Sequence, residues 1–313
     1  MTPRVVIARH LPEAGRALLA ERFDVDDDGV KDLAARVRGA DALVADPTVP
    51  VDAALLDAAG KSLKVVANFA VGYDNIDLAA CRERGVLVTN TPDVLTNATA
   101  ELAVALMLSA ARRAGEAERM VRAHRWEGWH PGQLLGRELS GSTVGIVGLG
   151  RIGTRVAELL QGFGITLLYA ARSRHAEQEA RLGAAHTDLD SLLERSDFVT
   201  LHVPLTAETH HLIDDRALRR MQPGAVLVNT SRGALVDSVA LARALRDGAL
   251  FAAGLDVYEQ EPTVPTELLE LENAVLLPHI GSATTTARSG MARLAAENVI
   301  AILEGRAPLT PVS

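Results

Sequence analysis

Short apolar runs alternate with stretches of helical apolar spacing along residues 1–98. Such runs are typical of buried strands, and a recurrence every three to four residues is typical of helices packed on a sheet. Strands that alternate with helices in this way predict parallel β-structure covered on both faces. We therefore expect a doubly wound, flavodoxin-like first domain with strands at Arg4–Ala8, Ala42–Ala45, Lys64–Phe69 and Val86–Thr89, and helices at Pro12–Phe23, Lys31–Arg38, Asp52–Ala59 and Leu78–Arg84.

The pattern changes at Thr99. Thr99–His124 has the spacing of one long helix, and its first half is apolar on most of its surface, which indicates burial on several sides. Strands and helices alternate again from Thr143 onward, which predicts a second doubly wound parallel sheet. Its expected strands are Thr143–Val147, Ile165–Ala170, Phe198–Val203, Ala225–Asn229, Ala252–Asp256 and Ala274–Leu277, and its expected helices are Arg155–Gln161 and Asp237–Gly248.

The last helix, Thr285–Leu303, is expected to return to the first domain. The predicted domains are therefore residues 1–98 with 286–313, and residues 99–285. A chain of 313 residues is long enough for two separate cores of this size.

Three glycines follow the strand Thr143–Val147 in G-x-G-x-x-G spacing: Gly148, Gly150 and Gly153. Between a strand and a helix, these glycines allow a tight turn, close approach of the backbone to a pyrophosphate, and close helix–strand packing. The start of the helix adds free N–H groups and the positive end of its dipole. This stretch predicts a Rossmann dinucleotide site, with Arg151 and Ile152 inside it.

Composition excludes several other classes of function. The net charge of −8 argues against a general nucleic-acid binder or a protein of anionic membrane surfaces. Cys81 is the only cysteine, which excludes an internal disulfide and a thiolate metal cluster, and we expect no metal site. The chain shows neither a signal peptide nor an apolar run long enough to span a membrane, so a cytoplasmic protein is expected.

Three stretches directly after predicted strands carry candidate chemistry: Asn229–Gly233, Gly254–Pro262 and Leu277–Ala283. In open α/β sheets, ligands bind at the carboxyl ends of the strands. The three stretches supply Arg232, Glu261 and His279, which are a fixed cation, a carboxylate and a group that titrates near neutrality.

The pair His210-His211 is a weaker candidate, because adjacent residues on a strand or helix point apart and would not share a metal. His202 ends a predicted strand, and a structural role is expected for it.

Several motifs in matching order give the chain a resemblance to a known family. Ala70–Asp77, Thr99–Ala103 and Pro278–Ser282 resemble the D-isomer-specific 2-hydroxyacid dehydrogenases, and most closely the glyoxylate/hydroxypyruvate reductase branch. The resemblance implies NAD(P)H-dependent reduction of glyoxylate or hydroxypyruvate to the D-2-hydroxy acid, and a homodimer. Two alternatives stay open: another D-2-hydroxyacid dehydrogenase of phosphoglycerate or lactate type, or a nucleotide-sensing, corepressor-like binding protein.

The resemblance also implies roles for individual residues. His279 would be the general acid, Glu261 its carboxylate partner and Arg232 the cation for the substrate. Val71 and Gly72 would bind the substrate carboxylate through backbone N–H groups. Trp129 is either a packing residue or a border of a neighbouring subunit's substrate pocket. Further cofactor contacts are expected at Asp256, which would meet the nicotinamide end, and at Val203, Pro204, Thr230 and Gly281.

One stretch departs from the pattern of NAD enzymes. An acidic residue is expected about 20 residues beyond the glycines, at the end of the second strand, where it binds the ribose hydroxyls. Ala171 occupies that place here, and Arg172, Ser173 and Arg174 follow it. We therefore predict NADP as the preferred cofactor, with NAD as the alternative. The competing interpretation is a surface turn with solvated arginines.

Overall fold

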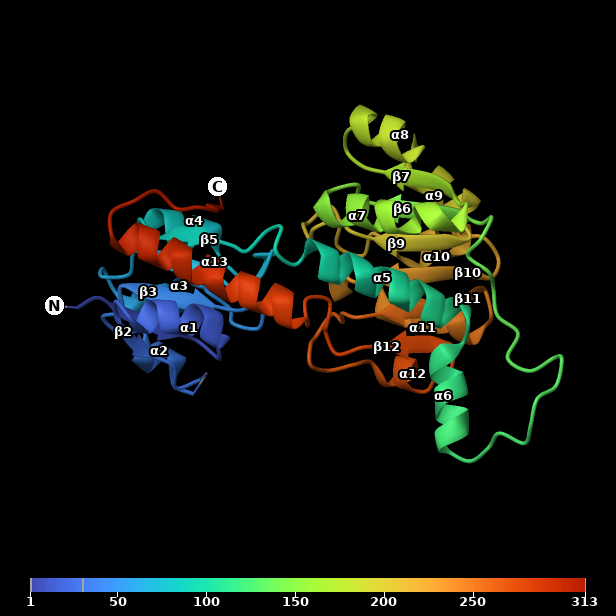
Figure 1. Ribbon diagram of the computed structural model, residues 1–313, viewed down its shortest axis with the longest axis horizontal. Helices are drawn as coiled ribbons and strands as arrows, with labels where there is room; N and C mark the ends of the chain where they lie inside the picture. The colour runs from blue at the N-terminus through green and yellow to red at the C-terminus, as the bar shows by residue number, and fades with distance from the viewer. Residues whose placement is uncertain (1, 30, 313) are drawn as a thin grey trace. The chain divides into compact units, whose positions relative to one another are not determined.

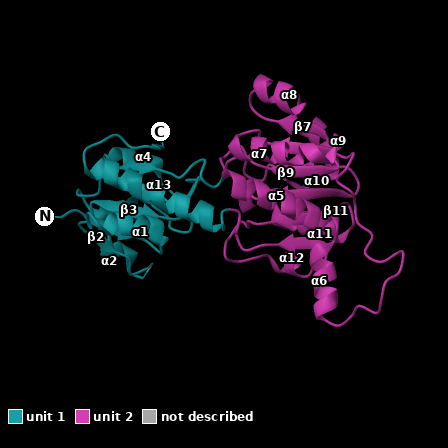
Figure 2. Cartoon of the chain, viewed as in Figure 1, with its two compact units in different colours: residues 1–95, 282–313 teal, residues 96–281 magenta. Residues whose placement is uncertain are grey.

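The computed structural model describes residues 2–29 and 31–312. The chain forms two compact units (Figure 2). Unit 1 comprises the residues up to Leu95 together with those from Ser282 onward, and unit 2 is the continuous segment Thr96–Gly281. The sequence placed the corresponding boundaries at residues 98 and 285.

Unit 1 contains, within the described residues, a five-stranded parallel sheet in the order β2-β1-β3-β4-β5. Every residue of β3 and β4 is buried, as expected for strands that helices cover on both sides. The strands are β1 (Arg4–Ile7), β2 (Asp24–Asp26), β3 (Ala42–Ala45), β4 (Val65–Asn68) and β5 (Leu87–Thr89). The helices are α1 (Glu13–Ala20), α2 (Leu33–Arg36), α3 (Ala53–Ala59), α4 (Leu78–Glu83) and α13 (Thr285–Leu303).

Helix α13 lies beside α1 in unit 1 (Figure 1). The contact is close: a Cβ built on Gly15 of α1 would lie 2.2 Å from the carbonyl oxygen of Ala292. The last helix of the chain is therefore part of the same unit as the first.

Unit 2 contains, in the described part of the chain, a seven-stranded parallel sheet in the order β12-β11-β10-β9-β6-β7-β8. Helices α5 and α7 pack on one face, and α9, α10 and α11 pack on the other. The strands are β6 (Thr143–Val147), β7 (Thr166–Ala170), β8 (Ala185–His186), β9 (Phe198–Leu201), β10 (Ala225–Asn229), β11 (Leu250–Leu255) and β12 (Ala274–Leu276). The helices are α5 (Thr96–Ala111), α6 (Ala114–Arg122), α7 (Arg151–Leu160), α8 (Ala176–Leu182), α9 (Leu189–Arg195), α10 (Asp215–Arg220), α11 (Ser238–Arg246) and α12 (Thr266–Leu269), with 3₁₀ turns at Gln161–Phe163 and Gly233–Leu235. The predicted fold class, two doubly wound parallel sheets, is confirmed.

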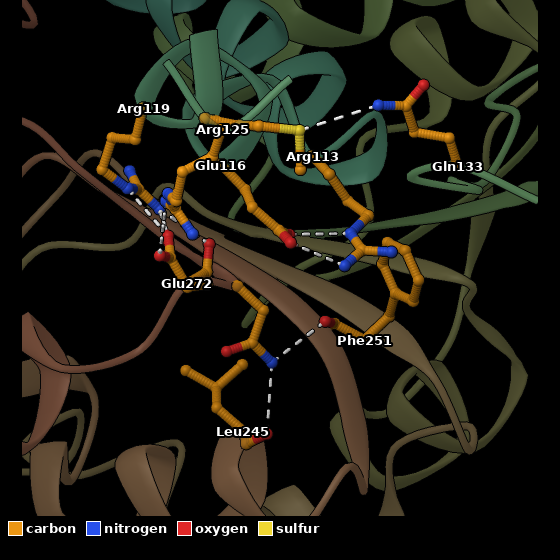
Figure 3. A network of polar contacts seen from close by, with 10 residues as sticks. Arg113, Glu116, Arg119, Arg125, Gln133, Leu245, Phe251 and Glu272 are labelled. Carbon is orange, nitrogen blue, oxygen red and sulfur yellow. Dashed lines mark hydrogen bonds and ion pairs between the residues drawn. The ribbon is translucent and has the colours of Figure 1, made fainter. Parts of the chain in front are cut away.

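The prediction of one helix over Thr99–His124 was wrong, because α5 ends at Ala111 and α6 begins at Ala114. Arg113 has a left-handed backbone with φ of 53°, which interrupts the helix. The carbonyl oxygen of Ala111 accepts a hydrogen bond from the Arg137 N–H at 2.8 Å instead of continuing the helical pattern. Arg113 also binds Glu116 through two hydrogen bonds of 2.8 Å, which stabilises the first turn of α6 (Figure 3).

Candidate active site

The predicted site residues of unit 2 follow the carboxyl ends of its strands. Gly148 follows β6, Arg172 lies two residues after β7, Val203 lies two residues after β9, Thr230 follows β10 and Asp256 follows β11. All of these strands are parallel and belong to one sheet, so their carboxyl ends lie along the same edge. This edge is where open α/β sheets bind ligands.

The glycine-rich turn forms an open cradle at the start of α7. Gly148 has φ of +97°, and a Cβ there would lie 2.8 Å from the carbonyl of His202. A Cβ on Gly153 would lie 2.1 Å from the carbonyl oxygen of Gly148. No heavy atom lies within 4 Å of the Cβ position of Gly150, and no side chain caps the ten-residue helix that begins after it. A helix start without a side-chain cap, beside open space, fits the pyrophosphate of a dinucleotide.

His279 and Glu261 form a hydrogen-bonded pair. The Nδ1 atom of His279 lies 2.7 Å from Oε2 of Glu261. Oε1 of the same carboxylate accepts the N–H of Tyr258 at 3.0 Å. Burial acts to raise the pKa of Glu261, but the hydrogen bond and charge of His279, with smaller contributions from Tyr258 and Arg232, lower it overall. The pair therefore consists of an ionised carboxylate and an imidazole whose Nε2 takes no part in it.

Asp256 determines the backbone path that carries His279. Its Oδ1 accepts the N–H of Ile280 and its Oδ2 accepts the N–H of Gly281, both at 2.7 Å. Its own carbonyl oxygen accepts the N–H of His279 at 2.9 Å, and His279 has a left-handed backbone with φ of 53°. Asp256 thus positions His279, a role that the sequence did not suggest. Its expected contact with the nicotinamide end stays a prediction.

The loops that carry Arg232 and Glu261 are packed closely together. A Cβ on Gly233 would lie 1.9 Å from the backbone carbon of Tyr258. Arg232 donates from Nη1 to the carbonyl oxygen of Ser231 at 2.8 Å, and its charge is one of the causes that lower the pKa of Glu261. The hydroxyl of Thr230 is buried and has no hydrogen-bond partner among the described residues, so a ligand at this edge could supply one.

Val71 and Gly72 belong to unit 1, where they follow β4. Asn90 donates from Nδ2 to the carbonyl oxygen of Val71, and Asn68 donates from Nδ2 to that of Gly72, each at 2.8 Å. Neither the Val71 N–H nor the Gly72 N–H donates to another described residue. Neither asparagine was predicted as a site residue from the sequence. The amide of Asn68, in an otherwise apolar strand, is a signal that could have indicated a special role for this residue.

Two histidine predictions meet different outcomes. Burial lowers the pKa of His202 to about 4, and its Nε2 lies 2.9 Å from Oγ1 of Thr200, which fits a neutral structural imidazole. The expectation that His210 and His211 point apart was wrong. Neither residue lies in a helix or strand, and His211 has a left-handed backbone with φ of 49°. The two imidazole rings stack, with their centroids 4.1 Å apart. His211 Nε2 lies 3.1 Å from Oε2 of Glu259.

A polar pocket lies at the opposite edge of the sheet of unit 2. Its lining includes Phe251, near the start of β11, and Asn273, which precedes β12. The charged groups around it are already paired, Arg113 with Glu116 and Arg119 with Glu272 (Figure 3). Nδ2 of Asn273 donates to the carbonyl oxygens of Leu245 and Phe251. Because these groups have partners and lie away from the carboxyl ends, we do not assign a substrate to this pocket.

Comparison with known proteins identifies the family. Residues 104–281 match the model of the D-isomer specific 2-hydroxyacid dehydrogenase NAD binding domain, which is more than half of the chain. The chain belongs to this family. The family predicted from the sequence is thereby confirmed, and the protein is a 2-hydroxyacid dehydrogenase-type oxidoreductase with a nicotinamide cofactor.

Relatives match over nearly the whole chain. The glyoxylate reductase of Thermococcus litoralis is 49% identical over 320 residues, covering 98% of this chain and 96% of the relative. The crystal structure of TT0316 protein from Thermus thermophilus has a TM-score of 0.92 at 46% identity and covers 99% of this chain and 100% of the other.

A second solved structure carries a cofactor. It is an NADPH-dependent glyoxylate/hydroxypyruvate reductase from Sinorhizobium meliloti in complex with NADP and malonate, with a TM-score of 0.91 and 36% identity. The alignment covers 100% of this chain and 97% of that one.

The described residues contain no helix that is both long and apolar enough to cross a membrane. They also contain no group of three or more histidine, cysteine, aspartate or glutamate side chains arranged to hold a metal ion.

Proposed function

We propose that this protein reduces glyoxylate or hydroxypyruvate to the D-2-hydroxy acid and prefers NADPH as the reductant. The observation that carries the proposal is the His279–Glu261 pair at the edge of the sheet where the glycine cradle lies. Relatives named glyoxylate reductase, at close to half identity over the whole chain, support the substrate. A cytoplasmic location stays a prediction from the sequence.

In the proposed reaction, the bound reduced nicotinamide supplies a hydride to the carbonyl carbon of the keto acid. His279 holds the proton that goes to the carbonyl oxygen, through the Nε2 atom that Glu261 leaves available. Glu261 favours the protonated imidazole and fixes its ring. Arg232 binds the substrate carboxylate and polarises the ketone, while the N–H groups of Val71 and Gly72 are proposed to bind that carboxylate as well.

Replacing Glu261 by glutamine should move the pH dependence of reduction. The amide keeps the shape of the side chain but lacks the negative charge with which Glu261 would stabilise a charged imidazole. We expect kcat for reduction to fall off about one pH unit or more below the wild-type midpoint. The measurement is a pH–rate profile of both proteins, with Glu259→Gln as a matched control. An unchanged profile for Glu261→Gln would remove Glu261 from its proposed role.

The wild-type protein should show a kcat/KM for NADPH about tenfold to a hundredfold above that for NADH, since one charge-assisted hydrogen bond to a phosphate contributes about 1.5–3 kcal/mol. Ala171 offers no carboxylate to repel the 2′-phosphate, and Arg172, Ser173 and Arg174 offer donors to it. Ala171→Asp combined with Arg172→Ala should reverse the preference. Equal or better use of NADH by the wild type would refute the NADPH proposal and leave the reductase proposal standing.

A panel of keto acids separates the proposed reductase from its alternatives. We expect turnover of glyoxylate and hydroxypyruvate to exceed that of pyruvate and of phosphohydroxypyruvate, measured as the decay of NAD(P)H absorbance. Higher kcat/KM with either of the latter two would favour a lactate-type or phosphoglycerate-type dehydrogenase. Cofactor binding without turnover of any keto acid would favour the corepressor-like binding protein.

We further propose that the protein is a homodimer in which an extended arm, residues 123–138, contacts a second copy. The arm follows α6 and leads away from the sheet of unit 2 (Figure 1). It exposes large apolar side chains to solvent, with Trp126 55%, Trp129 81% and Leu135 65% exposed, and such exposure is typical of interaction surfaces.

Sedimentation should therefore give twice the chain mass of 33.2 kDa. Trp129→Asp combined with Leu135→Asp should shift the protein toward the monomer, because the charges would be buried unpaired in the interface. Val239→Asp, at another exposed apolar side chain of unit 2, serves as the control and should leave the mass unchanged. A wild-type monomer would contradict the dimer proposal.

A further inference from the structure

The segment 309–312, which follows α13, pairs with the edge of the sheet of unit 1. The edge strand is β5. Thr89, its last residue, forms an antiparallel bridge with Pro311. The N–H of Asn90 donates to the carbonyl oxygen of Thr310 at 3.2 Å. The segment therefore covers backbone groups at an edge that a sheet otherwise leaves open.

A buried asparagine of α13 holds this segment in place. Asn298 is 0% exposed, and its Oδ1 accepts the N–H groups of Leu309 at 2.9 Å and Thr310 at 3.1 Å. Its Nδ2 donates to the carbonyl oxygen of Leu294 at 2.8 Å and to the hydroxyl of Thr310 at 2.9 Å. A side-chain amide has two donor hydrogens and an oxygen with two lone pairs, so Asn298 uses its full capacity. Because a buried amide is costly to leave unpaired, these contacts fix the segment.

Thr310 connects Asn298 to the residue that follows β5. The Oγ1 atom that accepts from Asn298 donates in turn to the carbonyl oxygen of Asn90 at 2.6 Å. The N–H of Asn90 also binds Thr310, so both backbone polar groups of Asn90 are held by one residue. The Asn90 side chain therefore starts from a fixed backbone.

Asn90 and Thr91 orient two consecutive peptide units of the loop after β4. Nδ2 of Asn90 donates to the carbonyl oxygen of Val71, and the N–H of Thr91 donates to that of Ala70, each at 2.8 Å. In a trans peptide unit, the carbonyl and the N–H that follows it point in opposite directions. The first bond therefore determines where the Gly72 N–H points, and the second does the same for the Val71 N–H.

These bonds also make the two N–H groups better donors. A hydrogen bond accepted by a carbonyl polarises the amide to which it belongs. The N–H groups of Val71 and Gly72 donate to no other described residue, and they are oriented before a ligand arrives. An anion that binds such preorganised donors loses less free energy in ordering them.

We propose that three residues form a hydrogen-bonded relay that positions the N–H groups of Val71 and Gly72 for the carboxylate of the keto acid. The relay consists of Asn298, Thr310 and Asn90. All three are positioning residues, because they act through the backbone of another loop and not on the substrate itself. The segment after α13 thereby helps to determine substrate affinity. This inference rests on the proposed function, in which Val71 and Gly72 bind the substrate carboxylate.

The test compares three variants of the relay with a matched control. Asn90→Ala removes the donor to Val71, Thr310→Val removes one hydroxyl with little change of shape, and Thr310→Ser keeps that hydroxyl. Asn273→Ala is the control, because Asn273 is a half-buried asparagine of unit 2 whose amide also donates to backbone carbonyl oxygens. The measurements are kcat and KM for glyoxylate at saturating reduced cofactor, the inhibition constant of oxamate, the pH dependence of kcat, and thermal unfolding. Oxamate is an unreactive probe that also carries a carboxylate next to a carbonyl.

Asn90→Ala should raise the KM for glyoxylate and the inhibition constant of oxamate about tenfold, while kcat changes less than about threefold, because the lost binding is common to substrate and transition state. Thr310→Val should raise both constants by about threefold, since it only loosens the support of Asn90. Thr310→Ser should behave as the wild type. The pH dependence of kcat should stay unchanged in all of them, because no titratable group is altered. Asn273→Ala should lower the unfolding temperature and leave both constants unchanged.

Three results would overturn the inference. One is a wild-type KM in a folded Asn90→Ala protein. Another is a wild-type KM in Thr310→Val, and this variant decides the matter if Asn90→Ala does not fold. The third is an equal rise of both constants in Asn273→Ala, which would mean that any loss of stability weakens substrate binding. A wild type that reduces no keto acid is a separate result: it refutes the proposed function and is visible before any variant is made.

Discussion

Replacement of His279 by alanine is expected to lower kcat for keto-acid reduction by roughly 10²–10⁴-fold, the usual contribution of a positioned general acid. The proton for the carbonyl oxygen is proposed to come from this imidazole, which Glu261 orients at 2.7 Å. The variant should still bind the reduced cofactor with near wild-type affinity, because the glycine cradle at Gly148–Gly153 is untouched. Steady-state rates and cofactor titrations measure the two effects separately.

His210→Ala is the matched control for this experiment. It removes an exposed imidazole of the same unit that has no contact with Glu261, and it should retain wild-type kcat. A folded His279→Ala protein with nearly unchanged turnover would refute the assignment of His279. A loss of cofactor binding in that variant would instead indicate that the loop after β12 had rearranged.

Replacement of Gly153 by alanine is expected to weaken the binding of both NADPH and NADH by about tenfold to a hundredfold. The added Cβ would lie 2.1 Å from the carbonyl oxygen of Gly148, and backbone cannot move aside as a flexible side chain can. Overpacking of this kind typically costs about 1–3 kcal/mol, and about 1.4 kcal/mol corresponds to tenfold in affinity. Fluorescence titration with each cofactor gives the affinity, and thermal unfolding reports the cost to stability.

Gly162→Ala serves as the control, because no heavy atom lies within 4 Å of its Cβ position and its backbone is not left-handed. Its affinity for cofactor should equal that of the wild type. If Gly153→Ala also binds both cofactors normally, α7 tolerates displacement and the cradle is less rigid than its geometry indicates.

Buried strands and long amphipathic helices could be predicted from the sequence, because burial imposes an apolar run or a regular spacing on them. Helices α8, α9 and α10 were not identified, since a helix of six or seven residues spans too few turns to show a period. The break between α5 and α6 was also missed. The break depends on the left-handed backbone of Arg113. The residues around it have good helix propensity, so the sequence contains no signal that the helix ends there.

The candidate site could likewise be predicted from the sequence only in part. The residues after each strand could be placed at one sheet edge, because parallel strands share a direction. The hydrogen bonds of Asp256 to Ile280 and Gly281, and those of Tyr169 and Arg174 to Glu179, join segments that are distant in the chain or that fold irregularly. Such contacts depend on tertiary structure, so spacing alone could not predict them. The roles of the site residues stay predictions until the variants are measured.

The position of α13 in unit 1 bears on how the chain is synthesised. Residues up to Leu95 emerge from the ribosome long before α13 is made, yet α13 packs on α1 and β4 in the finished unit. Unit 2 is continuous and can fold as soon as it has emerged, whereas the apolar surface that α13 covers stays exposed until α13 has been made. A chain that stops before Thr285 would therefore carry a folded unit 2 and an incomplete, protease-sensitive unit 1.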